Sequence, residues 1–194
     1  MIFTFNDSGK VKPSDSEYTK LTTINSITGN NLPDITGCGY LTIRRIGDGP
    51  SDSLGVFVDG STQVFPLNSI VRYGVTEGGF YKIYFQEKIS FTGKSDNHRY
   101  FYQTLLAEKP IVKKYNIVNG TTKNTDYVTI SGKGKILVSA SSFNPAMIYS
   151  IDGSSEYSFA FNGYQYMEFE FKNSFKFKSS TSTYAIYYLV YLEK

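Results

Sequence analysis

The sequence predicts an all-β protein: two tandem, duplicated antiparallel β-sandwich domains of jelly-roll type, preceded by an N-terminal arm. Three observations predict this fold class, namely an internal repeat, alternation of apolar and polar residues, and a composition rich in strand and turn formers. The 194 residues include 17 Tyr, 15 Phe and 17 Gly, and no long stretch has a helical period. We assign residues 1–19 to the arm, residues 20–109 to the first sandwich and residues 112–194 to the second.

The internal repeat consists of four landmarks that keep their order in both halves of the chain. Each pair shares glycines, aromatic residues or a closing Glu-Lys, and the pairs are "ITGCGYL" (Ile35–Leu41) with "ISGKGKI" (Ile130–Ile136), "VDGS" (Val58–Ser61) with "IDGS" (Ile151–Ser154), "YKIYFQEKISFTG" (Tyr81–Gly93) with "MEFEFKNSFKFKS" (Met167–Ser179), and "RYFYQTLLAEK" (Arg99–Lys109) with "YAIYYLVYLEK" (Tyr184–Lys194). Four matches in one order indicate a duplicated β-domain, because the repeat is too long for a solenoid unit. The first copy carries extra residues, "YGVTEGG" (Tyr73–Gly79), before its third landmark.

The third landmark predicts a β-hairpin in each unit. In "MEFEFKNSFKFKS", apolar and charged residues alternate on both sides of Lys172–Ser174, which we interpret as a three-residue loop. This register places four Phe on one face and ion pairs on the other, with the cross-strand pairs Phe171–Phe175, Phe169–Phe177, Glu170–Lys176 and Glu168–Lys178. The same register in the first unit pairs Phe85 with Ile89 and Ile83 with Phe91.

Six to eight short strands are expected in each unit, rich in aromatic and β-branched residues and separated by turn formers. In the second unit their ranges are Lys114–Val118, Tyr127–Ile130, Lys135–Ala140, Met147–Ile151, Tyr157–Phe161, Met167–Phe171, Phe175–Lys178 and Tyr184–Leu192. This spacing is typical of a two-layer sandwich. The stretch Glu108–Lys114 is predicted to be the hinge between the units.

Charge and composition exclude several classes of protein. The formal net charge of +3 is too small, and the lysines too scattered, for a nucleic-acid-binding surface. No apolar run reaches the length of a transmembrane helix, and "MIFTFNDSG" lacks the apolar core of a signal peptide. The single cysteine, Cys38, excludes an intrachain disulfide and a multi-cysteine metal site. We therefore expect a soluble protein made in a cytoplasm, with no membrane contact and no cofactor.

Two residues of catalytic type occur alone. His98 is the only histidine and lies in the turn-rich stretch "KSDNHRY", where Asp96 is close in sequence but nothing else marks a catalytic site. Cys38 lies between two turn glycines, where the second unit has Lys133. We interpret His98 as a loop residue and Cys38 as a small turn residue rather than a nucleophile.

Acidic residues form no recognisable site. Asp48, Asp52 and Asp59 lie in a glycine-containing stretch, but their spacing lacks the regular ligands and the distal Glu of a calcium loop. Glu168 and Glu170 are explained by the polar face of the predicted hairpin, although carboxylate pairs for glycoside hydrolysis meet only in space and so stay open. We assign no catalytic, cofactor-binding or metal-ligating residue and expect a protein without enzymatic activity.

The aromatic content exceeds what two small cores require. Alternation sends half of the tyrosines outward, so that in the last strand Tyr187 and Tyr191 share one face. Outward tyrosines can seal a protein interface or stack on a sugar, and we favour the interface because large apolar patches most often mark protein contacts. The candidate interface or ligand-contact residues are Tyr81, Tyr100, Tyr102, Tyr164, Tyr166, Tyr187 and Tyr191.

The duplicated units resemble β-rich virion proteins of tailed phages that infect Gram-positive bacteria. The resemblance lies in the opening strand "ISGKGKI", the "IDGS" turn and the aromatic last strand, and it extends over residues 20–194. It implies a tail, baseplate or fibre component that is located in the virion, forms a homo-oligomer and contacts other virion proteins. It implies no catalytic residue. A carbohydrate-binding module that recognises the bacterial cell wall is the alternative.

The N-terminal arm is expected to contribute to assembly. Its first residues, "MIFTF", alternate apolar side chains with Thr4 and suit the addition of a strand to the sheet edge of a neighbour. Main-chain hydrogen bonds and apolar anchoring would then tether one subunit to the next.

Overall fold

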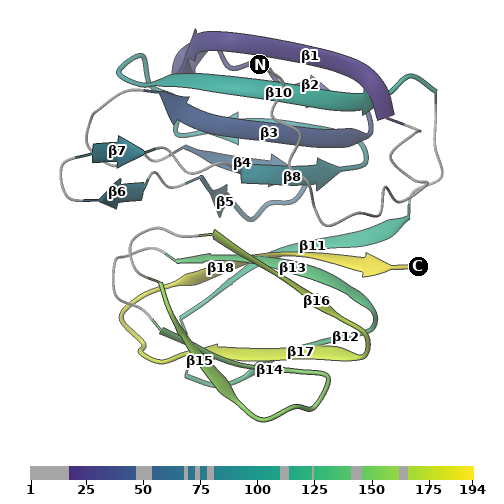
Figure 1. Cartoon of the computed structure of the whole chain (residues 1–194), viewed down its shortest axis with the longest axis vertical. Helices are drawn as coiled ribbons and strands as arrows, with labels where there is room; N and C mark the ends of the chain where they lie inside the picture. The colour runs from purple at the N-terminus through teal and green to yellow at the C-terminus, as the bar shows by residue number, and fades with distance from the viewer. Residues whose placement is uncertain are drawn as a thin grey trace.

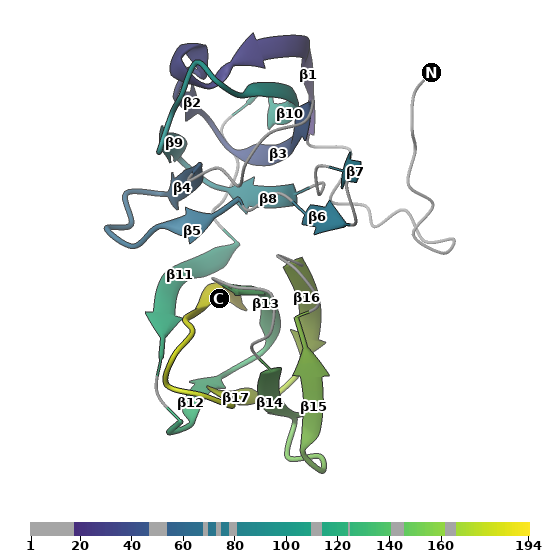
Figure 2. The same ribbon diagram turned by 90° about the vertical axis from the view of Figure 1, so that its left-hand side faces the viewer.

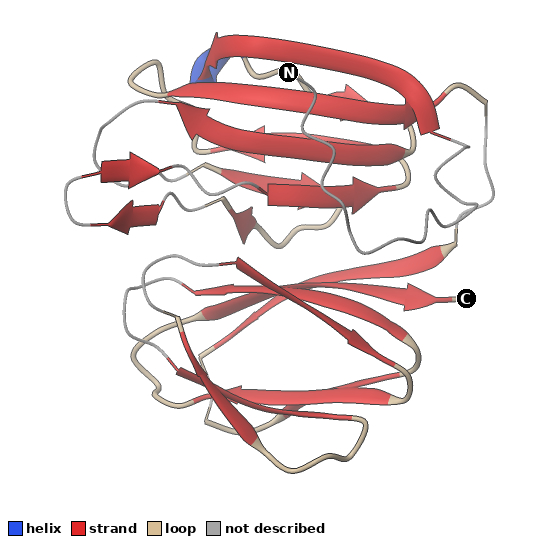
Figure 3. Ribbon diagram, viewed as in Figure 1, coloured by secondary structure: helices blue, strands red, loops and turns tan. Residues whose placement is uncertain are grey.

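The computed structural model of the chain describes residues 18–46, 54–67, 70–72, 75–77, 81–109, 114–123, 125–140, 146–161 and 166–194. Within these ranges every element is a β-strand except η2 (Gly29–Asn31), a single turn of 3-10 helix. The strands form two units, one above the other in Figure 1, and Figure 3 shows that strands dominate both. The predicted all-β fold with two duplicated sandwich units is confirmed. The predicted arm lies outside the described residues, except that its last two residues belong to the first strand.

Unit one, the first half of the chain, contains two four-stranded antiparallel sheets. The β1 sheet contains, in spatial order, β1 (Tyr18–Thr28), β10 (Arg99–Ala107), β3 (Gly39–Ile46) and β8 (Tyr81–Phe85). The β2 sheet contains β2 (Ile35–Thr36), β9 (Lys88–Thr92), β4 (Gly55–Val58) and β5 (Phe65–Pro66). A separate short hairpin, formed by β6 (Ile70–Arg72) and β7 (Val75–Glu77), overlaps the insertion predicted at Tyr73–Gly79.

Unit two, the second half of the chain, also contains two four-stranded antiparallel sheets. The β11 sheet contains, in spatial order, β11 (Tyr115–Thr122), β18 (Ile186–Glu193), β13 (Gly134–Ala140) and β16 (Tyr166–Phe171). The β12 sheet contains β12 (Val128–Ser131), β17 (Ser174–Ser179), β14 (Ala146–Ile151) and β15 (Tyr157–Ala160). Each strand predicted for this unit is present, and the largest boundary error is at β11, which continues from Val118 to Thr122.

The two units share one topology. Numbered from one to eight within each unit, with β6 and β7 left out, the strands follow the order 1-8-3-6 in one sheet and 2-7-4-5 in the other. This is the order of a jelly roll, in which two Greek keys form a double-layered sandwich. The predicted jelly-roll type and the predicted duplication are therefore confirmed.

The predicted hairpins are wrong in their pairing. β16 pairs with β13 in the β11 sheet, whereas β17 pairs with β12 and β14 in the β12 sheet. The loop at Lys172–Ser174 therefore crosses from one sheet to the other, and β8 and β9 are joined in the same way. As a result, Glu170 lies opposite Lys135 of β13 rather than opposite Lys176.

The four phenylalanines of the predicted hairpin nevertheless face one common core. Phe171, Phe175 and Phe177 are buried, and Phe169 is half-buried. The ring centroids of Phe169 and Phe175 lie 5.2 Å apart between the two sheets. An arch between facing sheets and a hairpin within one sheet both place alternate residues on a shared side, so alternation alone does not distinguish them.

The fourth landmark is shifted by one residue relative to the sequence match. Gly39 faces Leu106 in β10, and its counterpart in β13 faces Leu192 in β18, so Leu106 and Leu192 are equivalent. The sequence match pairs Leu106 with Tyr191 instead. A shift of one residue moves every side chain to the opposite face of a strand, and the true counterpart of Tyr191 is Leu105.

The second glycine of "GCG" and of "GKG" lets the last strand of each unit approach closely. A Cβ at Gly39 would lie 2.1 Å from the carbonyl oxygen of Leu105, and one at Gly134 would lie 2.0 Å from that of Tyr191. Both distances are far below van der Waals contact, so a side chain at either position would push the strands apart. The first landmark is therefore explained by packing.

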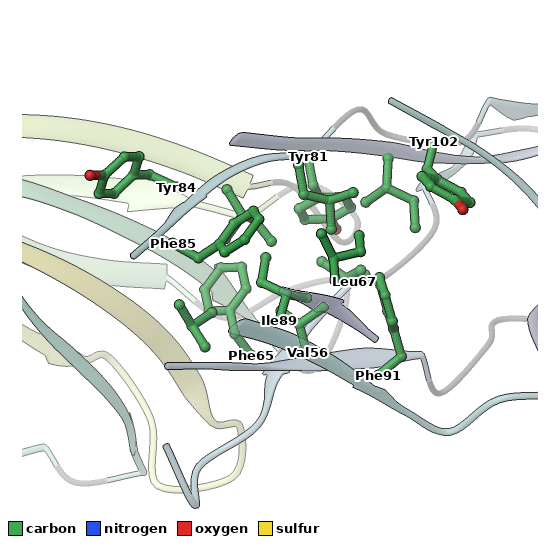
Figure 4. Packing of buried hydrophobic residues seen from close by; sticks show 14 of the residues in the cluster. Val56, Phe65, Leu67, Tyr81, Tyr84, Phe85, Ile89, Phe91 and Tyr102 are labelled. Atoms are coloured by element: carbon green, nitrogen blue, oxygen red, sulfur yellow. The ribbon is translucent and has the colours of Figure 1, made fainter. Parts of the chain in front are cut away.

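The core of unit one extends into unit two. Phe65, Phe85 and Ile89 lie together in this core (Figure 4) and are fully buried. Leu137 and Leu189, which lie in β13 and β18 of unit two, belong to the same buried cluster. Unit two also has a separate core between its own two sheets. The apolar surface that completes the core of unit one is therefore supplied by unit two.

Candidate functional site

Two of the candidate tyrosines are core residues of unit one. Tyr100 and Tyr102 of β10 are 3% and 6% exposed and belong to the unit-one core. Neither is available to an outside partner, so the expectation of an outward contact is wrong for both. Tyr164 lies outside the described residues.

The other four candidate tyrosines lie where the two units meet. Tyr81 and Tyr191 are buried there, and Tyr166 and Tyr187 are half-buried against the same cluster. The ring centroids of Tyr81 and Tyr166, which belong to different units, are 5.4 Å apart. The Tyr166 hydroxyl also lies 3.4 Å from the carbonyl oxygen of Lys82 in unit one. Sequence reasoning thus selected residues of a contact inside the chain, which we call the inter-unit junction.

At the inter-unit junction, the edge of one sandwich lies against the sheet face of the other. Unit one contributes β5 and β8, the terminal strands of its two sheets, and Figure 2 shows them on the side that faces the β11 sheet. Unit two contributes the outer face of that sheet, including Leu137, Leu189 and Tyr191. Terminal strands carry N–H and C=O groups without a strand partner, and covering them protects a sheet from unwanted pairing.

Tyr191 satisfies both backbone groups of one residue in the edge strand β8. Its hydroxyl accepts a hydrogen bond from the N–H of Tyr84 at 3.2 Å and donates one to the carbonyl oxygen of Tyr84 at 3.1 Å. Burial raises the pKa of Tyr191 well above its usual value, so the hydroxyl stays protonated. Because two buried backbone groups depend on this hydroxyl, it fixes the position of β8 on the β11 sheet.

Gln86 makes a second two-point contact. Its side-chain amide donates a hydrogen bond to the carbonyl oxygen of Tyr115 at 2.8 Å and accepts one from the N–H of Tyr115 at 2.9 Å. The amide therefore takes the place of a strand partner for the first residue of β11. A further contact joins Asn119 Nδ2 to the carbonyl oxygen of Gln63 at 2.7 Å, so side chains of both units contribute hydrogen bonds.

Tyr84 is the centre of a cluster of tyrosine rings that spans the junction. Its ring centroid lies 5.1 Å from that of Tyr40 and 6.1 Å from that of Tyr18 in unit one. It lies 5.4 Å from the ring of Tyr115 and 6.0 Å from the ring of Tyr191 in unit two. Three of these four contacts are edge-to-face, an arrangement that aromatic rings prefer. Burial raises the pKa of Tyr84 strongly, so its hydroxyl is neutral and accepts a hydrogen bond from Tyr18 at 3.2 Å.

The "VDGS" and "IDGS" landmarks are explained by an aspartate that holds a loop. Asp59 accepts hydrogen bonds from the three consecutive N–H groups of residues 86–88 at 2.8 to 3.1 Å. Asp152 does the same for residues 172–174 at 2.6 to 3.1 Å. Both aspartates have a positive φ, of 50° and 52°. The landmark therefore fixes the loop that crosses between the two sheets, and in unit one this is the loop that carries Gln86.

The two residues of catalytic type also have structural contacts. Cys38 Sγ lies 3.3 Å from the hydroxyl of Tyr84, and the Cys38 carbonyl accepts a hydrogen bond from the N–H of Ala107 at 2.9 Å. His98 lies in the turn before β10, where its carbonyl oxygen accepts a hydrogen bond from the N–H of Gly29 at 2.9 Å. Its Nδ1 has no hydrogen-bond partner among the described residues.

A cavity of about 250 Å³ lies at one corner of unit two. Its charged lining residues are Lys133, Lys135, Asp152, Glu170, Lys172 and Glu193. Lys133 Nζ is 2.7 Å from a carboxylate oxygen of Glu193, so part of this charge is already paired. In unit one, Tyr40 and Tyr84 occupy the positions of Lys135 and Glu170, so the equivalent corner is aromatic rather than charged.

Comparisons with known proteins assign the chain to no family. A scan against protein-family models found no match, and a search of curated proteins found none with significant similarity. The described part of the chain contains no group of three or more His, Cys, Asp or Glu side chains placed to hold a metal ion. Asp48 and Asp52, which we considered for a calcium loop, lie outside it. None of the described helical segments has the length and apolar character to cross a membrane.

Sequence reasoning missed several residues that make the junction. Gln86, Tyr84 and Tyr115 were not among the candidates. The available signal was a departure from the repeat: unit two has Lys172 and Glu170 where unit one has Gln86 and Tyr84. At these two positions, unit one contacts unit two through Gln86 and Tyr84.

Proposed function

We propose that the protein is a non-enzymatic structural component of a phage particle, in a tail, baseplate or fibre, and that it assembles with other virion proteins. The inter-unit junction is the observation that carries this proposal, because buried tyrosine hydroxyls and the Gln86 amide hold two jelly rolls in one arrangement. Jelly rolls occur in viral capsid proteins and in lectins. The resemblance of the repeated landmarks to virion proteins favours the first of these, since a fixed pair of domains suits a building block with constant spacing.

Location in a particle is the direct test of this proposal. An antibody against the protein, detected with gold in negative-stain images of particles from its source, is expected to label one regular position. Particles that carry no label, although the same antibody detects the protein in the infected cell, would contradict a structural role in the virion.

A truncation tests the role of the N-terminal arm. Deletion of residues 1–17 is expected to leave both units folded, because β1 begins at Tyr18 and the Tyr18 hydroxyl bonds Tyr84. The same deletion should lower incorporation into particles, since the arm is proposed to tether neighbours. Unchanged incorporation would remove the arm from the proposal.

Binding of bacterial cell-wall carbohydrate is the second candidate function. The observation that favours it is the charged cavity of unit two, whose lysine and carboxylate groups suit hydrogen bonding to sugar hydroxyls. Calorimetric titration with purified cell-wall fragments tests it, with Lys172→Ala expected to weaken binding and Lys123→Ala, an exposed residue away from the cavity lining, as the control. Equal binding by both variants would contradict a site in this cavity.

A further inference from the structure

Each sandwich has one side that is formed by a terminal strand from each of its two sheets, and this side carries a further inference. In unit one this side is formed by β5 and β8, and in unit two by β15 and β16, which lie on one side of the sandwich in Figure 2. The strand registers make three pairs of apolar residues equivalent: Phe65 with Tyr157, Leu67 with Phe159, and Ile83 with Phe169. We call Tyr157, Phe159 and Phe169 the open side of unit two.

These equivalent residues differ in exposure. Phe65 and Ile83 are 0% exposed, in a cluster to which unit two contributes Leu137. Tyr157 is 53% exposed and Phe169 is half-buried. The open side of unit two is thus an apolar surface of the kind that unit one buries within the chain.

The outer face of the β1 sheet is the counterpart of the face that covers unit one. Leu21 and Leu105 occupy there the positions that Ile117 and Tyr191 occupy in the β11 sheet. Leu21 is 57% exposed and Leu105 is half-buried. One chain therefore has a second pair of surfaces equivalent to those that meet at the inter-unit junction. They are the open side of unit two and the partly apolar outer face of the β1 sheet of unit one.

Charged residues lie on or beside both of these surfaces. The outer face of the β1 sheet carries Arg44, whose guanidinium lies 5.6 Å from the ring centroid of Phe101, and the exposed Lys82. The open side of unit two is flanked by the exposed residues Glu156, which precedes β15, and Glu170 in β16. Glu170 also lines the cavity that contains Lys133, Lys135 and Lys172, and Glu156 accepts a hydrogen bond from the Tyr127 hydroxyl. Part of the acidic charge is therefore already paired, and charge adds only weakly to the association of the two surfaces.

We propose that the open side of unit two docks on the outer face of the β1 sheet of a second copy of this chain, so that the inter-unit junction is repeated between molecules. This proposal rests on the structural role proposed above and names the partner. Because two different surfaces meet, the contact is heterologous, and each added copy again presents a free surface at both ends. Such contacts generate a ring when the rotation closes and a filament when it does not.

The contact between copies is weaker than the contact within the chain. At the centre of the β1 face, Thr42 and Gln103 take the places of Leu137 and Leu189. Less apolar surface is therefore buried there, and the association is reversible and depends on protein concentration.

Sedimentation velocity of the full-length chain over a concentration series tests the proposal. The wild-type chain is expected to form a series of species beyond a dimer. Leu21→Asp on the β1 face and Tyr157→Asp on the open side should each raise the concentration needed for association by at least about tenfold. Val118→Asp is the matched control, because Val118 is 44% exposed in β11, the terminal strand at the far side of its sheet from β16. Circular dichroism verifies that each variant folds.

A mixture of the two variants gives the decisive result. The Leu21→Asp chain retains its open side and the Tyr157→Asp chain retains its β1 face, so an equimolar mixture should form a one-to-one dimer and nothing larger. A wild-type chain that stays monomeric throughout, or variants that still associate with themselves, would overturn the proposal. Association that appears only after deletion of residues 1–17 would also overturn it and would assign the β1 face to that segment.

The outcome is separable from the proposed function. Gold labelling of particles tests whether the protein belongs to a virion, whereas sedimentation tests which partner covers the open side. A labelled particle together with a strictly monomeric purified chain would leave the virion role intact and remove the head-to-tail contact.

Discussion

Unit one and unit two have the same strand order and opposite roles in the chain. Unit one presents its edge, and its core is completed by side chains of unit two. Unit two presents a sheet face, and the corresponding edge of its own sandwich remains half-exposed. Since the topology is shared, the difference lies in side chains, such as Gln86 where unit two has Lys172 and Tyr84 where it has Glu170. The two units thus keep one fold, and substitutions in a loop, an edge strand and a sheet face accompany the difference in which surface is buried.

The largest expected difference between the units is at the equivalent positions Phe65 and Tyr157. Phe65→Ala should lower the free energy of unfolding by about 3–5 kcal/mol, because it leaves a cavity in a core closed by unit two. Tyr157→Ala should lower it by less than about 1 kcal/mol, because the ring is 53% exposed. Urea unfolding followed by circular dichroism measures both. Equal losses for the two variants would contradict the contrast between the covered and the open side.

The hydroxyl of Tyr191 tests whether the junction depends on hydrogen bonds. Tyr191→Phe should lower the free energy of unfolding by about 2–4 kcal/mol, because it leaves the N–H and the carbonyl oxygen of Tyr84 buried without a partner. Faster exchange of the Tyr84 amide hydrogen, measured by NMR, should accompany the loss. Tyr187→Phe, in the same strand and half-buried, is the control and should change neither quantity appreciably.

A smaller effect is expected at the loop that distinguishes the units. Gln86→Ala removes two hydrogen bonds to Tyr115 and should cost about 1–2 kcal/mol, because water can reach this half-buried position and replace them in part. Lys172→Ala, the equivalent change in unit two, alters an exposed side chain and should leave the melting temperature within about one degree. A larger loss for Lys172→Ala than for Gln86→Ala would reverse the assignment of the junction.

The smallest effect is a dependence on pH that arises at the Asp152 loop of unit two. Hydrogen bonds from the N–H groups of Ser174, Asn173 and Lys172 lower the pKa of Asp152. Its stabilising contribution is therefore present above the unfolded value of about 3.9 and is lost as the pH falls through the lower pKa of the folded state. Asp152→Asn should make the fall in melting temperature below about pH 4 less steep.

A control separates this effect from the general loss of charge at low pH. Asp126→Asn, which removes one carboxylate at an exposed position outside this loop, is that control. If Asp126→Asn and Asp152→Asn flatten the profile equally, the loop contacts do not account for the pH dependence.

The sequence predicted the strands well because their signals are local. The strands of unit two are rich in aromatic and β-branched residues between turn formers, and "IDGS" marks a tight turn in which Asp152 and Gly153 have positive φ. The duplication was also visible, since glycines and aspartates needed for close approach or for loop binding recur at fixed places. The pairing of strands could not be predicted from the sequence, because the alternation around Lys172–Ser174 fits a hairpin within one sheet as well as it fits an arch between two sheets.

The candidate site could be predicted only in part. The excess of tyrosine was interpreted as an outward contact surface, and four of the candidates, Tyr81, Tyr166, Tyr187 and Tyr191, lie at the inter-unit junction. The partner in that contact proved to be the other unit of the same chain, which local pattern does not specify. Tyr100 and Tyr102 were assigned to an outward surface although they belong to the core of unit one.

By itself, the sequence determined the all-β class, the two copies, the strand ranges and the turns, because each of these follows from residues close together in the chain. The tertiary structure decided which strands share a sheet. It also decided the one-residue shift that places Tyr191 on the outer face of the β11 sheet, and the contact between the edge of unit one and that face, where Tyr191 bonds Tyr84. The contact between Tyr84 and Tyr191 joins residues 107 positions apart. These features depend on which surfaces remain uncovered once each sandwich has formed, a property that no short stretch of sequence carries.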